Sequence, residues 1–174
     1  MPKVLVLYDS KTGNTRRMAY AVAEGARSIK QVSVDLKRVD RANLADLRGA
    51  HGIIIGSPTY YGQMSAKTKA LIDKSVRIHG SLEGKVGAAF TSSGATASGA
   101  ETTLLSIIES MLIHGMIVQG RSERQHYGVA AVGPPKKGDL RLCMKLGQRV
   151  SKLVVTLYDS NRPASTKRSS TRAS

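Results

Sequence analysis

Hydroxyl and amide side chains surround one glycine near the start of the sequence. Residues 9–15 read DSKTGNT; they follow the apolar run VLVLY and precede a helical pattern that begins at Thr15. The N-terminus of a helix carries unpaired N–H groups and a partial positive charge, which together attract anions. Gly13 allows the backbone to curl or to approach a ligand closely. We therefore predict a phosphate site, formed by Ser10, Lys11, Thr12, Gly13, Asn14 and Thr15.

The sequence does not match the motifs of other nucleotide-binding, metal-binding or catalytic sites. The dinucleotide fingerprint needs three glycines, and this loop has only Gly13. The triphosphate loop needs a lysine after its second glycine, but Ala100 follows Gly99 in the nearest match. The four histidines and the single cysteine, Cys143, show no metal-ligand spacing, and no G-x-S-x-G segment occurs. We predict neither a metal site nor a catalytic side chain.

Strand and helix patterns alternate along the chain and should position this loop. We predict strands at residues 3–8, 32–39, 52–56, 85–91 and 116–119, and helices at 15–29, 42–47, 65–75, 101–115 and from about 139 onward. Such alternation implies a parallel sheet with right-handed crossovers and helices on both faces. Because ligands bind at the carboxyl ends of such strands, the loops at 9–15, 57–64 and 92–100 should meet there.

Length and charge set further bounds. The 174 residues fit one domain, which we assign to 1–159, followed by a basic tail at 160–174 that we expect to be disordered. Four positive charges of the formal +15 lie in the last fourteen residues, which leaves +11 on the rest. A basic surface attracts anions. With no apolar run long enough to cross a membrane and no signal-peptide pattern, we expect a cytoplasmic protein.

Two loops carry a resemblance to a known family. The segment SKTGNT resembles the S/T-x-T-G-x-T loop that holds the FMN phosphate in flavodoxins. The segment GSPTYYGQMS, at 56–65, resembles the G-T/S-P-T-x-x-G-x-M-S pattern of the WrbA family of NAD(P)H:quinone oxidoreductases. The resemblance implies a flavodoxin-like fold with a five-stranded parallel sheet, FMN as cofactor and NAD(P)H as co-substrate. It also implies a quinone acceptor and a homo-oligomer, a dimer or tetramer.

The resemblance also implies further site residues. The second loop would meet the flavin ring through Pro58, Thr59, Tyr60, Tyr61 and Gly62. The third loop, in FTSSGATASGA, would line it with Ser92, Ser93, Gly94, Ala95 and Thr96. His114 matches the family's H-G-M histidine, which lies near the flavin of a neighbouring subunit. For the substrate pocket we name His79 and Tyr127, the latter because HYG resembles the family's P-Y-G.

Several positions depart from the family pattern. The chain has no Trp, although the family carries an aromatic cap, usually Trp, before the fourth strand. Thr12 stands where the family commonly has Tyr, and the third loop has fewer glycines than the family pattern and one residue more. Arg16, Arg17 and Arg77 either attract the phosphates of a pyridine nucleotide or are solvated helix residues.

Three functions remain open at this point. The first is an FMN-dependent two-electron transfer from NAD(P)H to quinones. The second is a flavodoxin-like electron carrier without NAD(P)H activity of its own, although the basic charge is unusual for such carriers. The third is a basic module that associates with nucleic acid; this is the least favoured, because the chain lacks aromatic binding platforms and any recognition motif.

Overall fold

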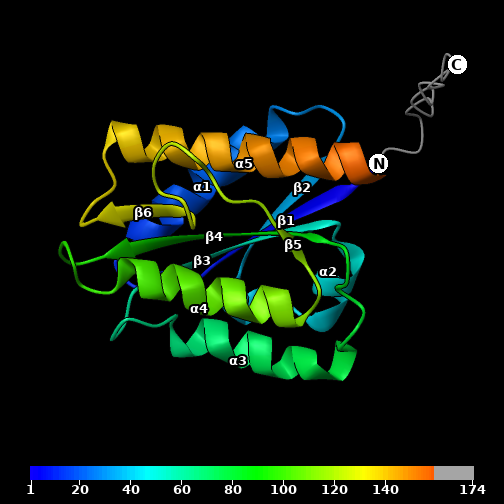
Figure 1. The fold of residues 1–174 in the computed structure, drawn as a ribbon, viewed down its shortest axis with the longest axis horizontal. Coiled ribbons are helices and arrows are strands. Elements are labelled where there is room, and N and C mark those ends of the chain that lie inside the picture. The colour runs from blue at the N-terminus through cyan, green and yellow to red at the C-terminus, as the bar shows by residue number, and fades with distance from the viewer. Residues whose placement is uncertain (159–174) are drawn as a thin grey trace, which may run out of the picture.

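A parallel sheet forms the middle layer of the protein. The computed structural model describes residues 1–158 (Figure 1). The strands are β1 (Lys3–Tyr8), β2 (Ser33–Arg38), β3 (Gly52–Pro58), β4 (Val86–Ser93), β5 (Ile117–Val118) and β6 (Val129–Val132). Their order is β2-β1-β3-β4-β5, and β6 also pairs with β4. All pairs are parallel, as the alternation of the sequence predicted.

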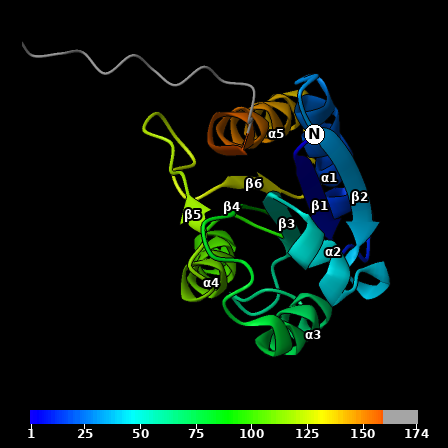
Figure 2. The same ribbon diagram turned by 90° about the vertical axis from the view of Figure 1, so that its right-hand side faces the viewer.

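Helices cover both faces of the sheet. They are α1 (Asn14–Arg27), α2 (Leu44–Gly49), α3 (Ala66–Lys74), α4 (Ala100–Ile113) and α5 (Lys137–Tyr158), with short 3₁₀ turns η1 (Val39–Arg41) and η2 (Ser75–Ile78). In Figure 1, α1 and α5 lie on one side of the sheet and α3 and α4 on the other. Figure 2, in which the right-hand side of Figure 1 faces the viewer, shows the same three layers.

The alternation of side chains along β1 explains the two cores. Val4 and Val6 point to the side of α1 and α5, and Leu5 and Leu7 point to the opposite side. All four side chains are buried. A strand between two helical layers must be apolar on both faces, which is why this run is continuously hydrophobic.

Two glycines allow α1 and α5 to pack closely. A Cβ added at Gly25 would overlap the carbonyl of Met144, and one added at Gly147 would overlap the carbonyl of Val22. The two backbones therefore meet at these positions. This contact packs α1 closely against α5 on one face of the sheet.

The sheet has one strand more than the sequence predicted. Residues 120–138 were expected to be loop, but β6 lies within them. Val129 pairs with Phe90 and Val132 with Ser93, while β5 pairs only with Val86 and Gly87. The two short strands therefore share one edge of β4. The run VAAV was missed because four small apolar residues between glycines give too weak a strand signal.

Other predictions concern the ends of the chain. The last helix starts at Lys137, two residues before the expected start. The predicted tail at 160–174 lies outside the described residues. Within residues 1–158, no helix is long and apolar enough to cross a membrane.

Candidate functional site

The register of the sheet brings the three predicted loops to one edge. Tyr8, the last residue of β1, is level with Gly56, and Gly56 is level with Phe90. The loops after β1, β3 and β4 therefore leave the sheet at nearly the same height. Figure 1 shows them at the left, where α1 and α4 begin. Parallel sheets of this topology bind ligands at this edge.

The first loop ends in a left-handed glycine that starts α1. Gly13 is the N-cap residue, with φ of 96°, and no side chain caps the helix. The hydroxyl of Ser10 accepts the N–H of Gly13 at 3.1 Å, which closes the turn. The side chains of Lys11 and Thr12 are exposed. The start of α1 therefore faces a cup of backbone and side-chain donors, as an anion site requires.

A buried hydrogen bond joins the first loop to the third. The hydroxyls of Thr15 and Ser92 lie 2.8 Å apart, and both side chains are buried. Ser92 also accepts the N–H of Thr59 through its backbone carbonyl, at 2.8 Å. The end of β4 thus contacts both neighbouring loops, the one after β1 and the one after β3. Of the predicted site residues, Thr15 and Ser92 act as supports beneath the surface.

The second and third loops touch through two glycines. Gly62 has φ of 73° and Gly99, the N-cap of α4, has φ of 91°. A Cβ added at Gly99 would lie 2.5 Å from the Cα of Gly62, so only glycine permits this contact. Residues 94–98 of the third loop, including Thr96, are exposed.

Two tyrosines stand at the second loop. Tyr60 forms a two-bond bridge with Gln63, with both N···O distances at 3.0 Å. Tyr61 has a positive φ of 50° and a fully exposed side chain. A tyrosine held in the left-handed region without packing partners is conformationally costly, which is common at functional sites. Both rings are available to stack on a planar ligand.

A fourth segment reaches the same edge and was not predicted. The N–H of Gly133, which follows β6, donates to the carbonyl of Ser93 at 2.8 Å. The turn at 133–136 therefore lies beside the third loop. Two adjacent prolines after Gly133 could have signalled a turn, but without β6 nothing in the sequence placed that turn at the edge.

Comparison with known proteins agrees with this geometry. The model of a family described as NADPH-dependent FMN reductase matches residues 2–125, which is most of the chain.

The chain belongs to this family.

Relatives of this FMN reductase family member carry two kinds of name. A flavodoxin of Aquifex aeolicus is 38% identical over 93% of this chain and 92% of its own length. An NAD(P)H dehydrogenase (quinone) of Archaeoglobus fulgidus is 35% identical over 90% of this chain and 100% of its own length.

Solved structures confirm the flavodoxin-like fold. A flavodoxin from the domain Archaea superposes with a TM-score of 0.73 at 31% identity, covering 87% of this chain and 98% of its own. A WrbA-like flavodoxin from Agrobacterium tumefaciens gives 0.78 at 28% identity, covering 90% and 99%. The resemblance to flavodoxin-like, WrbA-type proteins that the loop motifs indicated is thereby confirmed.

Within one chain of this FMN reductase family member, His79 and His114 lie away from the three loops at the edge of the sheet. His114 ends α4, whose 14 residues separate it from the third loop by ~20 Å. It lies instead beside His79, with ring centroids 5.8 Å apart. The role of His114 near a flavin stays a prediction that requires a neighbouring subunit, and that of His79 in the substrate pocket stays a prediction.

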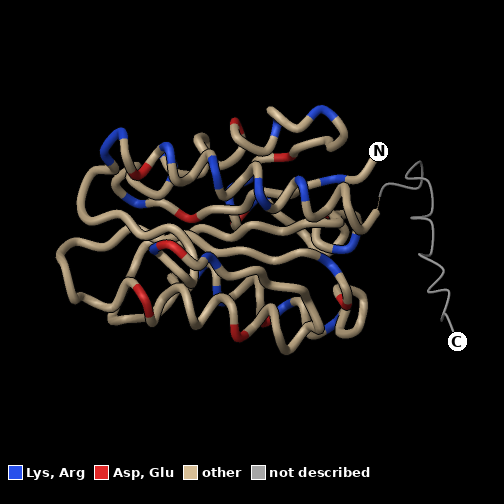
Figure 3. The backbone as a smooth tube through the Cα atoms, turned by 45° about the horizontal axis from the view of Figure 1, so that its top comes forward, with Lys and Arg blue, Asp and Glu red and all other residues tan. Residues whose placement is uncertain are grey.

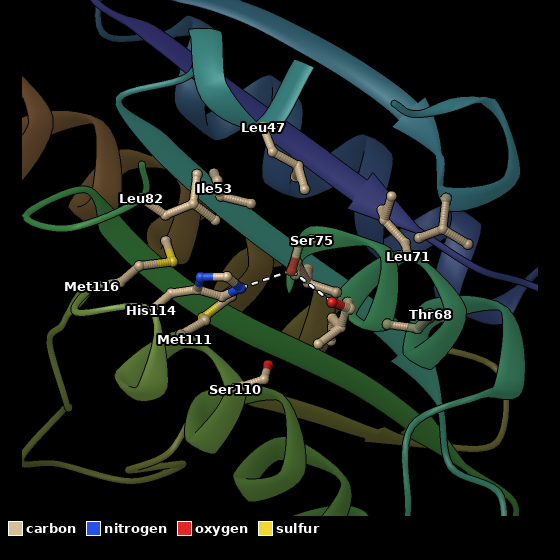
Figure 4. A pocket seen from close by; sticks show the side chains of 13 residues that line it. Leu47, Ile53, Thr68, Leu71, Ser75, Leu82, Ser110, Met111, His114 and Met116 are labelled. Atoms are coloured by element: carbon tan, nitrogen blue, oxygen red, sulfur yellow. Dashed lines mark hydrogen bonds between the residues drawn. The ribbon is translucent and has the colours of Figure 1, made fainter. Parts of the chain in front are cut away.

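His114 lines a small apolar cavity between α3 and α4 (Figure 4). Its Nε2 lies 2.7 Å from the hydroxyl of Ser75, and that hydroxyl donates to the carbonyl of Ile72 at 2.6 Å. Because the single hydroxyl proton of Ser75 is used in the bond to Ile72, Nε2 of His114 must carry a proton and donate it to the Ser75 oxygen. Burial, and then the neighbouring His79, lower the pKa of His114, which keeps its ring neutral near pH 7.

The remaining predicted residues lie at various distances from the edge. Tyr127 precedes β6 and is half exposed, so β6 separates it from the loop edge. Arg16 and Arg17 are exposed in the first turn of α1, next to the cup. Arg77 lies in η2, after α3 and at the opposite end of the sheet from the loops.

Proposed function

We propose that this protein is an FMN-dependent oxidoreductase that transfers two electrons from NAD(P)H to a quinone. The observation that carries the proposal is the glycine-capped start of α1, which opens onto the shared edge of three loops. Membership of the FMN reductase family and relatives named NAD(P)H dehydrogenase (quinone) support it.

The first loop fits the phosphate of FMN. A phosphate dianion would accept hydrogen bonds from the start of α1 and from the side chains of Thr12 and Asn14, which are not buried. The hydroxyl of Ser10 accepts the N–H of Gly13, which holds the shape of the loop, and its own proton can still be donated to a phosphate oxygen. The hydroxyl of Thr15 is paired with that of Ser92. The absence of acidic residues from the first turn of α1 leaves the helix dipole available to the anion.

The second and third loops fit the flavin ring. The two loops meet at the close contact of Gly62 with Gly99, and Tyr60 or Tyr61 can stack on the flavin ring. Bound FMN would supply the hydride and electron transfer chemistry itself. The chain has to orient the ring, present polar groups to its edge and leave one face open to substrate, so it needs no general acid or nucleophile.

The cofactor part is tested by comparing FMN with riboflavin, which lacks the phosphate. The purified protein should show flavin absorption or acquire it on titration, and it should bind FMN more tightly than riboflavin. The double variant Thr12→Ala/Asn14→Ala should lose most of that preference, whereas Ser81→Ala, an exposed serine away from the edge, should keep it. Equal affinity of the wild type for both flavins would refute the phosphate assignment.

The redox part is tested by NADPH or NADH consumption with benzoquinone as acceptor. Turnover that depends on both FMN and the quinone supports the reductase. A second candidate, an electron carrier without NAD(P)H activity, is favoured by relatives named flavodoxin. Tight FMN binding with no NAD(P)H oxidation would select the carrier.

We further propose that the protein forms a homo-oligomer and acts in the cytoplasm. Exposed apolar side chains at the ends of α3 and α4, among them Val76, Leu112 and Ile113, support association. An oligomer would also bring His79 and His114 of one chain to a neighbour. A single cysteine, which cannot form an internal disulfide, suits a reducing compartment. Light scattering measures the oligomer, and a monomer at micromolar concentration would contradict it.

A further inference from the structure

A polar cavity lies between α5 and the segment that joins β5 to β6. Its volume is about 210 Å³, and its wall includes Arg121, Lys145 and Arg149. Figures 1 and 2 both show the joining segment, in yellow-green, running alongside α5 and outside the sheet. None of the residues of the three flavin-site loops lines this cavity.

Positive charge exceeds negative charge in the cavity. Glu123 pairs with Arg121, and Lys145 and Arg124 also lie close enough to lower the pKa of this carboxyl. The residues that line the cavity thus include three cations, Arg121, Lys145 and Arg149, and one carboxylate, Glu123. In Figure 3, Lys and Arg outnumber Asp and Glu along the layer formed by α1 and α5. The cavity is thus a local concentration of a wider basic surface.

Arg149 is the cation of this group that is partly buried and has no ion pair in the described part of the chain. Its side chain is partly buried, and within residues 1–158 no carboxylate oxygen lies within 4.0 Å of its guanidinium. Its polar contact is a long hydrogen bond to the carbonyl of Gly120, at 3.4 Å. Burial and the neighbouring Arg121 lower its pKa, which shows that the charge is poorly solvated where it stands. A partly buried guanidinium without a counter-ion is costly, and an anion in the cavity would remove that cost.

A second hollow lies next to the cavity along α5. This groove has a volume of about 420 Å³ and shares Lys145 and Arg149 with the cavity. Its other walls include Gln119, Gln148 and Lys152. Amide side chains hydrogen-bond to hydroxyl and ring-nitrogen groups of a ligand and carry no charge themselves. The two hollows together suit a ligand with an anionic end and a polar, uncharged body.

We propose that this cavity is a second anion site, separate from the flavin-binding edge, that binds the phosphate of a small phosphorylated compound. The guanidinium groups of Arg121 and Arg149 would hold the phosphate oxygens, since arginine matches phosphate geometry with paired donors. Lys145 adds a point charge at the entrance to the groove. The polar body of the ligand, such as the sugar and base of a nucleotide, would lie along the groove beside Gln148 and Lys152.

The test measures binding of ADP by calorimetry to protein saturated with FMN, so that the flavin site is already filled. Pyrophosphate should compete with ADP, and adenosine should bind at least tenfold more weakly than ADP. Arg149→Gln should weaken ADP binding about tenfold. The matched control is Arg141→Gln, which removes the same charge from an exposed position on the same helix outside the cavity, and it should change the affinity less than twofold.

Arg149→Lys separates charge from geometry and guards against a folding defect. It should keep part of the ADP affinity with an unchanged thermal unfolding temperature. Loss of ADP binding on FMN saturation would overturn the proposal, because the anion would then be using the flavin site. So would equal effects of the Arg141 and Arg149 variants. Binding of an oligonucleotide or an anionic vesicle without binding of ADP or pyrophosphate would also overturn it, since it would indicate a general polyanion surface.

Discussion

The hydroxyls of Thr15 and Ser92 lie 2.8 Å apart and join the start of α1 to the end of β4. Because both side chains are buried, Thr15→Val would leave the hydroxyl of Ser92 without this partner, which costs about 1–3 kcal/mol. We expect the free energy of unfolding, measured in urea, to fall by that amount. FMN affinity should fall roughly tenfold, because the two loops lose their link.

Thr15→Ser is the matched control for this prediction, since it keeps the hydroxyl, and it should retain most of the affinity. If Thr15→Val bound FMN as tightly as the wild type, the link would have no part in holding the site together.

Gly13 should resist replacement because of its backbone conformation. At a φ of 96°, an alanine costs about 1 kcal/mol or more, although space for a Cβ exists. Gly13→Ala should therefore lower both stability and FMN affinity. Gly138→Ala, in the first turn of α5 with nothing near the added methyl group, should stabilise the protein by ~0.5 kcal/mol and leave FMN binding unchanged. Similar effects of the two variants would contradict the assigned role of Gly13.

His114 should make the stability of the protein depend on pH. Its pKa in the folded state lies below the ordinary 6.5, so the unfolded chain takes up a proton first as the pH falls. The stabilising contribution is therefore complete above pH 6.5 and is lost progressively below it. His114→Gln should reduce the loss of stability as the pH falls below the ordinary histidine pKa of 6.5. His51, whose pKa is also lowered by burial, should account for part of the loss that remains.

This pH effect is measured by urea unfolding at several pH values. A pH profile of His114→Gln that superposes on that of the wild type would show that His114 titrates normally in the folded protein.

Cys143 should be unreactive in the folded protein. It is completely buried in α5, and burial raises the pKa of its thiol to about 12. Since the thiolate is the reactive form, a disulfide reagent at pH 8 should label it only as fast as the protein unfolds. Labelling should become rapid in denaturant. Fast labelling under native conditions would show that α5 opens locally.

The sequence by itself determined the parts of the protein that depend on local patterns. The alternation of apolar runs and helical stripes predicted a parallel sheet, and DSKTGNT indicated the glycine-containing loop before α1 where we propose the anion site. Both signals are local, because a buried strand and a glycine-capped helix start each leave a short, characteristic pattern. The same locality explains the failure at β6: the run VAAV is stabilised by its pairing with β4 and not by its own composition.

Only the tertiary structure decided which distant residues meet. The hydrogen bond between Thr15 and Ser92 and the contact of Gly62 with Gly99 depend on the register of neighbouring strands, which no local pattern encodes. The same holds for Arg121, in the segment that joins β5 to β6, and Arg149, in α5, which line one cavity. His114 stands a full helix away from the third loop of its own chain, so its expected place near a flavin stays a prediction about a neighbouring subunit. Side-chain type indicates what chemistry is available, and the packing of the elements decides where that chemistry is assembled.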